Sequence, residues 1–122
     1  MDKILCVVNN PKDVTTLIEH LSEQFHILVT PDPAMALKYA RIDPTIRIVF
    51  SDYKLPFMDG NKLLAQIKEV RPKIFRILLS DYEELRTIIP KTTVGVVQNF
   101  ISKPWDPDIL NSIVSYAYQS SH

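Results

Sequence analysis

The sequence predicts an α/β fold in which helices cover both faces of a parallel sheet. Short apolar runs alternate along the chain with stretches whose apolar residues recur every three or four positions. Most of the short runs are rich in β-branched residues, as buried strands are. Regular alternation of strand and helix produces parallel strands, because each connection crosses over the sheet. The 122 residues, 46% of them hydrophobic, predict one domain spanning residues 1–122.

The first half of the chain gives two strand–helix units and a third strand. Residues 4–8 form the first apolar run, and Asn10-Pro11 then marks a helix start because a capping side chain precedes a proline. Residues 27–29 form the second run, and Asp32-Pro33 marks the second helix start, which Asp43-Pro44 ends. The third run is 46–50. In the first helix the apolar residues Val14, Leu17, Ile18 and Leu21 repeat with helical spacing, and in the second Leu37 and Ala40 are expected to face the core.

The second half repeats the pattern. The third helix ends at Arg71-Pro72, the fourth and fifth apolar runs are 75–79 and 96–101, and Asp106-Pro107 starts the last helix. The fourth helix, within 82–89, should be short or broken, because Pro90 lacks an N–H and clashes with the preceding turn. The apolar faces of the third and last helices comprise Leu63, Leu64, Ile67, Val70, Ile109, Leu110, Ile113, Val114 and Ala117.

Composition excludes several classes of protein. Lys plus Arg equals Asp plus Glu at 14 each, so the basic excess of a nucleic-acid or membrane-surface module is absent. No apolar run approaches the roughly 18 residues of a membrane span, and the single cysteine excludes an internal disulfide. We therefore expect a soluble cytoplasmic domain that binds neither nucleic acid directly nor membrane. With only two glycines, a Gly-rich phosphate loop is excluded.

Polar side chains follow the predicted strands at the edge where such sheets bind ligands. Asp52 ends the third strand, Ser80 the fourth and Lys103 the fifth, while Asn9 and Asn10 follow the first. A carboxylate, a hydroxyl and an ammonium that converge in this way suit phosphoryl transfer. Asp52 would be the nucleophile, Ser80 would donate to a phosphoryl oxygen and Lys103 would neutralise its charge.

The segment 48–60, which reads IVFSDYKLPFMDG, resembles the phosphoacceptor segment of response-regulator receiver domains, and 100–105, FISKPW, resembles their Lys-Pro motif. The resemblance covers about residues 3–118 and implies a flavodoxin-like doubly wound (βα)5 fold with strand order 2-1-3-4-5. It implies that Asp52 accepts phosphate from a histidine kinase or phosphotransfer protein. It also implies an inward-turning switch aromatic at Phe100 and a cis Lys103-Pro104 bond. A homodimer or an output domain would use the face of helix 4, strand 5 and helix 5.

The resemblance also implies a Mg²⁺ site formed by the residues after the first strand, Asp52 and the backbone carbonyl of Lys54. The family has two acidic residues where this chain has Asn9 and Asn10. An amide oxygen ligates a hard cation but brings no charge, so we expect Mg²⁺ binding that is weak or absent. Asp81 is the nearest spare carboxylate.

Other interpretations stay open for some of these residues. Asn10 is also a good helix cap, Phe100 could be simple core packing, and Asp59 is expected to cap the third helix rather than bind metal. At the level of function, the alternative to a phospho-receiver is a pseudo-receiver, a binding module that signals without phosphorylation because of Asn9 and Asn10. A phosphohydrolase with an aspartyl nucleophile would need an acid two residues after Asp52, where Lys54 stands. We therefore expect that this protein is not an enzyme.

Overall fold

One twisted parallel sheet forms the centre of the molecule. The structure, a computed structural model, describes residues 2–21 and 23–120, and within them five strands pair in the order β2-β1-β3-β4-β5. The predicted α/β class and strand order are therefore confirmed. The strands are β1 (Lys3–Val7), β2 (His26–Thr30), β3 (Ile46–Asp52), β4 (Phe75–Asp81) and β5 (Asn99–Lys103). The helices are α1 (Pro11–Leu21), α2 (Pro33–Ile42), α3 (Gly60–Val70), α4 (Tyr82–Ile88) and α5 (Pro107–Ser120).

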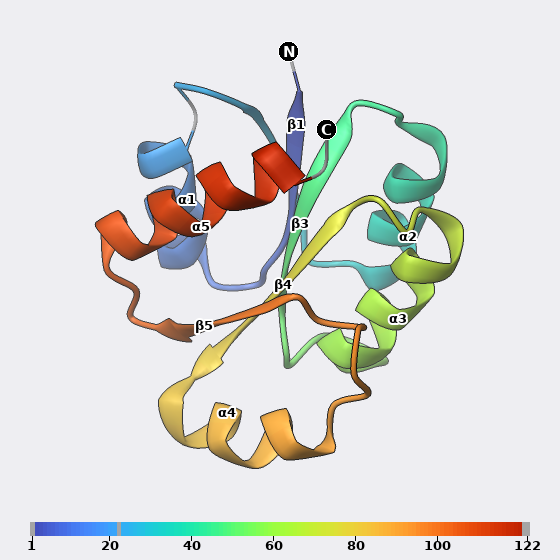
Figure 1. Ribbon diagram of the computed structural model, residues 1–122, viewed down its shortest axis with the longest axis vertical. Coiled ribbons are helices and arrows are strands. Elements are labelled where there is room, and N and C mark those ends of the chain that lie inside the picture. The colour runs from blue at the N-terminus through green and yellow to red at the C-terminus, as the bar shows by residue number, and fades with distance from the viewer. Residues whose placement is uncertain (1, 22, 121–122) are drawn as a thin grey trace.

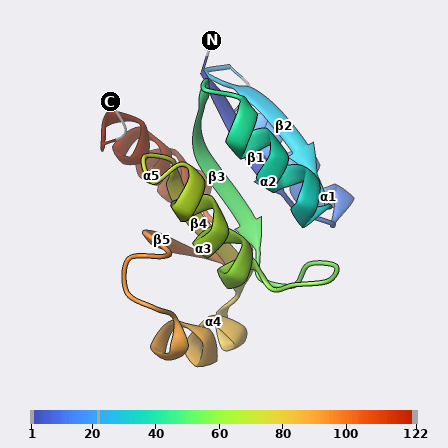
Figure 2. The ribbon, with the colours of Figure 1, turned by 90° about the vertical axis from the view of Figure 1, so that its right-hand side faces the viewer.

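The sheet separates two hydrophobic layers (Figures 1 and 2). Side chains alternate along each strand, so Ile4 and Cys6 of β1 join the layer of α1 and α5, whereas Leu5 and Val7 join the layer of α2 and α3. These four side chains are fully buried, as expected for a strand with helices on both faces. Helix α4 lies beyond the end of β4 and contributes Leu85 and Ile88 to the second layer.

The predicted helix starts are confirmed. The side-chain oxygens of Asn10, Asp32 and Asp106 accept hydrogen bonds from backbone N–H groups two residues later, at 2.8, 2.9 and 2.7 Å. The helices begin at the prolines between, which need no hydrogen-bond partner there. The stops are confirmed as well, since α2 and α3 end one residue before Asp43 and Arg71.

The prediction that the fourth helix is short is also confirmed. Helix α4 spans seven residues, and Ile89–Lys91 then form a single 3₁₀ turn around Pro90. The Thr92 hydroxyl donates to the carbonyl of Ile88 at 2.9 Å, which satisfies one of the carbonyls that the interrupted helix leaves free.

The fifth strand begins later than predicted, at Asn99 rather than at residue 96. The reason is Arg76, a buried residue at the start of β4. Its Nε donates to the carbonyl of Val96 at 2.8 Å, and its other nitrogens donate to the carbonyls of Gly95, Pro72 and Ile74. Residues 95–96 are thereby held in a turn, and apolarity at Val96 reflects burial rather than strand pairing.

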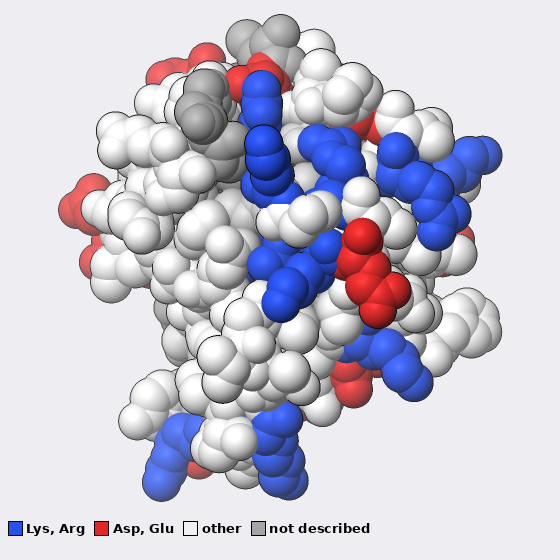
Figure 3. Space-filling view, turned by 45° about the vertical axis from the view of Figure 1, so that its right-hand side comes forward, with Lys and Arg blue, Asp and Glu red and all other residues white. Residues whose placement is uncertain are grey.

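The balanced total charge conceals an uneven distribution. Lys and Arg side chains gather on the α2–α3 side of the molecule (Figure 3). Residues 33–73 hold eight Lys or Arg against four Asp or Glu. The rest of the chain therefore has an equal acidic excess. In the part of the chain that the structure describes, no helix has both the length and the apolarity needed to cross a membrane.

Candidate functional site

Asp52, Ser80 and Lys103 come together at the carboxyl edge of the sheet and line a cavity of about 190 Å³. The parallel register explains why, because Asp52 pairs with Leu79, one residue before Ser80, and Lys103 pairs with Asp81, one residue after it. Tyr53, Lys54, Asp81 and Glu84 complete the lining. The cavity therefore combines three carboxylates, two hydroxyls and two ammonium groups.

Asp52 is a buried carboxylate, only 7% exposed. Its Oδ1 lies 2.6 Å from the Nζ of Lys103, and its Oδ2 accepts a hydrogen bond of 3.2 Å from the backbone N–H of Asn9. Burial raises the pKa of Asp52 above its usual value of 3.8, while the contacts with Lys103 and Asn9 oppose that rise. The carboxylate is thus desolvated but has positive charge close to one oxygen.

The start of α3 packs directly against the backbone of Asp52. A Cβ added to Gly60 would overlap the Asp52 carbonyl oxygen and lie 2.8 Å from a methyl of Leu78. The Gly60 N–H donates to the Tyr53 carbonyl at 2.7 Å. Glycine is therefore required here for close approach of the helix to the strand end, not for a special backbone angle.

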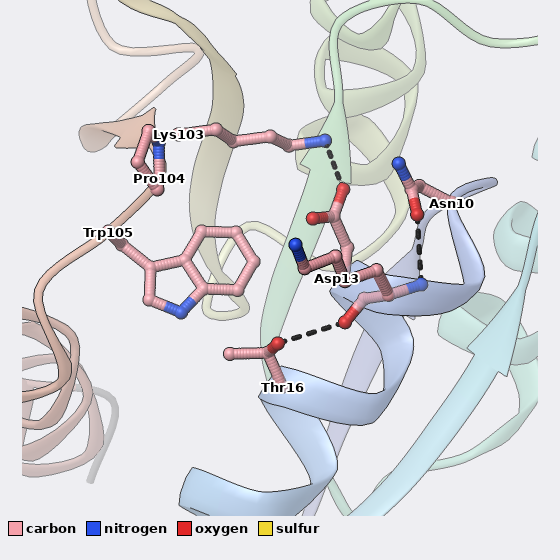
Figure 4. A pocket seen from close by; sticks show the side chains of 7 residues that line it. Asn10, Asp13, Thr16, Lys103, Pro104 and Trp105 are labelled. Atoms are coloured by element: carbon pink, nitrogen blue, oxygen red, sulfur yellow. Dashed lines mark hydrogen bonds and ion pairs between the residues drawn. The ribbon is translucent and has the colours of Figure 1, made fainter.

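Lys103 is shared between two carboxylates. Its Nζ lies 2.6 Å from Asp13 in the first turn of α1 (Figure 4). It also lies 2.6 Å from Asp52. Burial would lower the pKa of Lys103, but the hydrogen bonds and charges of Asp13 and Asp52 outweigh burial and raise it. Lys103 therefore stays protonated and acts as a fixed positive charge beside Asp52.

Lys103 also borders a second cavity of about 360 Å³, which lies between α1 and the connection from β5 to α5. Asn10, just before α1, and Asp13 and Thr16 of α1 line it, and the Trp105 indole faces the first turns of this helix (Figure 4). The Lys103-Pro104 bond in this connection is cis, as the resemblance implies.

Ser80 is 4% exposed, and its hydroxyl donates to the Oε1 of Glu84. The other carboxylate oxygen of Glu84 lies 3.2 Å from the Nζ of Lys54. A carboxylate from the first turn of α4 thus holds the hydroxyl that was predicted to bind a phosphoryl oxygen.

The side chains of Asn9 and Asn10 are not placed as the predicted metal ligands. Both are exposed; Asn9 reaches Asp52 through its backbone N–H, and the side chain of Asn10 caps α1. Asp81, the suggested spare carboxylate, is exposed and caps α4 by accepting from the Glu84 N–H at 2.7 Å. Asp59 caps α3 by accepting from the Lys62 N–H at 2.8 Å, as expected.

These residues fit a divalent cation poorly. Among residues 2–21 and 23–120, no three His, Cys, Asp or Glu side chains are grouped so that they could hold a metal ion. Of the four predicted ligands, only Asp52 brings a charge, and an ammonium already lies against its Oδ1. Mg²⁺ prefers several oxygen ligands with carboxylates among them, so the donor set departs from what it favours.

Phe100, the predicted switch aromatic, is half-buried and packs against the hydrophobic layer of α2 and α3. It also lines a third cavity, of about 240 Å³, with Trp105, Ile109 and Ile113. The side chain is thus neither fully packed in the core nor free in solvent. Its role as a switch remains a prediction.

Two residues that the sequence reasoning did not select, Asp13 and Glu84, contact the site. Glu84 lies four residues after Ser80, in the first turn of α4, which begins directly after β4. This short sequence separation was a usable signal. Asp13 carried no comparable signal, because its contact with Lys103 joins residues 90 positions apart.

Comparisons with known proteins agree with this geometry. Residues 4–115 match the family model of the response regulator receiver domain. The chain is 28% identical over 119 residues to the hydrogenase transcriptional regulatory protein HoxA of Cupriavidus necator, of which it spans 24%. The signal receiver domain of an HD domain-containing protein from Pseudomonas fluorescens superposes with a TM-score of 0.89, 30% identity and coverage of 99% of this chain and 89% of that one.

A further solved structure shows the same fold. It is the receiver domain of a sensor histidine kinase from Pseudomonas aeruginosa, with magnesium coordinated in its active-site cleft. Its TM-score is 0.80 at 19% identity, over 94% of this chain and 95% of that one. The predicted family is confirmed: this chain belongs to the response regulator receiver domains.

Proposed function

We propose that this chain is a phospho-receiver of a two-component phosphorelay and that Asp52 accepts the phosphoryl group from a histidine kinase or phosphotransfer protein. One observation carries the proposal: a buried carboxylate at the end of β3 lies 2.6 Å from an ammonium and shares a cavity with a serine hydroxyl. A carboxylate oxygen of Asp52 attacks phosphorus, the phosphorus–nitrogen bond of phosphohistidine breaks, and the leaving imidazole nitrogen takes up a proton. The product is an acyl phosphate on Asp52.

The neighbouring residues stabilise the negative charge that the transfer brings into the cavity. Lys103 is already in place beside Asp52 and offsets charge on the phosphoryl oxygens, as ammonium groups do in other phosphoryl-transfer sites. Ser80 donates to one of those oxygens once its hydroxyl leaves Glu84. In this proposal the chain is a signalling module, not an enzyme in its own right.

The output would pass through the face formed by α4, β5 and α5, either to a second copy or to an output domain. Phe100 lies on this face and would turn inward with Ser80 on phosphorylation. The chain spans about a quarter of its curated transcriptional-regulator relatives, 24% for HoxA, so most of such a protein lies outside the matched region. We propose a cytoplasmic location, with no direct contact of this domain with nucleic acid or membrane.

The Asn9/Asn10 pair favours a second candidate function, a pseudo-receiver that binds its partner without phosphorylation. Here Lys103 would serve as a permanent counter-ion for Asp52. The partner would bind the surface of α4, β5 and α5 in a single conformation. The two candidates differ in whether Asp52 reacts.

Beryllofluoride, which mimics a phosphoryl group on a carboxylate, tests the role of Asp52. The native protein should show changes in the NMR spectrum at Ser80 and Phe100 when beryllofluoride is added, and Asp52→Asn should show none. Asp81→Asn is the matched control, because Asp81 lines the same cavity and Asn caps a helix as well as Asp does. Equal changes in Asp52→Asn would refute the assignment, and no change in the native protein would favour the pseudo-receiver.

A magnesium titration followed by NMR or Trp105 fluorescence measures the effect of the two asparagines. Each ion–charge attraction at about 4 Å and an effective dielectric near 20 is on the order of 4 kcal/mol per unit charge, partly offset by dehydration of the ion. We expect binding weaker than about millimolar in the native protein and tighter by at least about tenfold in Asn9→Asp/Asn10→Asp. Equal affinities would show that the asparagines are not the cause of weak binding.

A further inference from the structure

Glu84 accepts the hydrogen bond of the hydroxyl that the proposed function assigns to a phosphoryl oxygen. Its side chain is 20% exposed, its Oε1 accepts the hydrogen bond of the Ser80 hydroxyl, and its Oε2 lies 3.2 Å from the Nζ of Lys54. It lines the same 190 Å³ cavity as Asp52 and Lys103. A carboxylate therefore uses one of the hydrogen-bond donors that the proposed phosphoryl group needs.

A carboxylate and a phosphoryl group make the same demands on these partners. Both accept hydrogen bonds from a hydroxyl and pair with an ammonium, and both are negatively charged. A Ser hydroxyl has one hydrogen to donate, so Ser80 cannot donate to Glu84 and to a phosphoryl oxygen together. Two anions in a partly desolvated cavity also repel one another.

From these contacts we infer that Glu84 is an internal competitor for the phosphoryl group and that anion binding at Asp52 displaces it. The inference rests on the proposed function and adds a link from the site to the partner face. Glu84 belongs to the first turn of α4, whose capping residue Asp81 lines the same cavity. Release of Glu84 from Ser80 and Lys54 removes two contacts that hold the start of this seven-residue helix against the cavity.

Binding of inorganic phosphate, followed by NMR at the Ser80 and Asp81 amides, tests the competition without any covalent step. Glu84→Gln removes the charge and keeps the shape. Glu83→Gln is the matched control, because Glu83 has the same charge in the same turn but is 79% exposed and pairs only with Arg86 in the contacts described. Phosphate should bind Glu84→Gln about tenfold more tightly than the native protein, as expected for loss of one nearby like charge. Glu83→Gln should bind as the native protein does.

Equal binding by all three proteins, or equal tightening in both variants, would overturn the inference. A double-mutant cycle with Ser80→Ala adds a second check, because the gain from Glu84→Gln should shrink when the contested hydroxyl is removed. A gain that is unchanged in the Ser80→Ala background would count against competition for that hydroxyl.

Phosphorylation by acetyl phosphate separates this inference from the proposed function. Glu84→Gln should react at lower donor concentrations than the native protein and Glu83→Gln, and its α4 amides should already be shifted part of the way toward their positions in the adduct. If no protein forms an adduct while Glu84→Gln still binds phosphate more tightly, the proposed function fails and the competition stands. If adducts form at equal donor concentrations and the α4 signals do not move, the competition fails and the proposed function stands.

Discussion

At the scale of single residues, burial disfavours the charged form of the Asp52 carboxylate. Burial raises its pKa, so between the usual value of 3.8 and the higher folded-state value the folded protein binds more protons than the unfolded chain. Stability therefore falls as the pH rises through this window, and above it the buried charge is a cost. Such a destabilising buried charge is typical of functional sites, where a reactive carboxylate is needed.

Asp52→Asn should accordingly stabilise the protein at neutral pH, by on the order of 1 kcal/mol. The Asn side chain carries no charge to desolvate, and Lys103 keeps Asp13 as its partner. The gain should shrink as the pH falls from the raised folded-state pKa toward 3.8, and it should be absent below 3.8, where Asp52 is protonated in both states. Urea unfolding at several pH values measures it; a gain that grows toward low pH would contradict the account.

The pKa of Asp43 is shifted in the opposite direction from that of Asp52. Its hydrogen bonds with Lys3 and Thr45 lower its pKa to about 2, so its contribution to stability is full above 3.8 and is lost as the pH falls toward 2. Asp43→Asn should destabilise the protein at neutral pH, and the difference from native should disappear in acid. The same urea experiments check this, and a variant as stable as native at pH 7 would refute it.

At the scale of elements, Arg76 decides where β5 begins. Its guanidinium is 3% exposed and donates to four backbone carbonyls, although burial lowers its pKa. Arg76→Met should destabilise the fold by about 3 kcal/mol, because hydrogen bonds to a charged group are lost and carbonyls are left unsatisfied. Faster amide exchange should be confined largely to 93–98. Unchanged stability would show that the hydrogen bonds of Arg76 are not needed to stabilise the fold.

Helix α4 should be less protected than α3. It spans seven residues and buries Leu85 and Ile88, whereas α3 spans eleven and buries Gly60, Leu63, Leu64 and Ile67. Elements with little buried apolar surface open locally at lower free energy. Amide exchange in α4 should therefore be faster than in α3, which serves as the internal control. Equal protection in the two helices would contradict this, and would weaken the view of α4 as the element that moves.

At the scale of the whole molecule, the sequence predicted what depends on local pattern. Strand–helix alternation and the Asn10, Asp32 and Asp106 caps depend on neighbouring residues, and once the strands are parallel Asp52, Ser80 and Lys103 must meet at one edge. The later start of β5 was missed because the turn at Val96 depends on a buried Arg76 within an apolar strand. The contact between Lys103 and Asp13 was missed because it depends on how α1 sits relative to β5.

The site as a whole has a composition unlike the one that the resemblance implies. Lys103 supplies the positive charge beside Asp52, Asp13 also pairs with Lys103, and Glu84 accepts the hydrogen bond of the Ser80 hydroxyl. This arrangement suits a receiver that depends on its own side chains for charge balance more than on Mg²⁺. In the proposed function Asp52 is nevertheless the residue that accepts the phosphoryl group.

Intact mass spectrometry after incubation with acetyl phosphate tests that claim most directly. The native protein, with Mg²⁺ present, should gain the mass of one phosphoryl group, slowly, and Asp52→Asn should gain none. The Asn9→Asp/Asn10→Asp variant should gain it faster, which shows that the donor and the assay work. A native protein that stays unmodified while this variant is phosphorylated, or an Asp52→Asn protein that still gains the phosphoryl mass, would contradict the account.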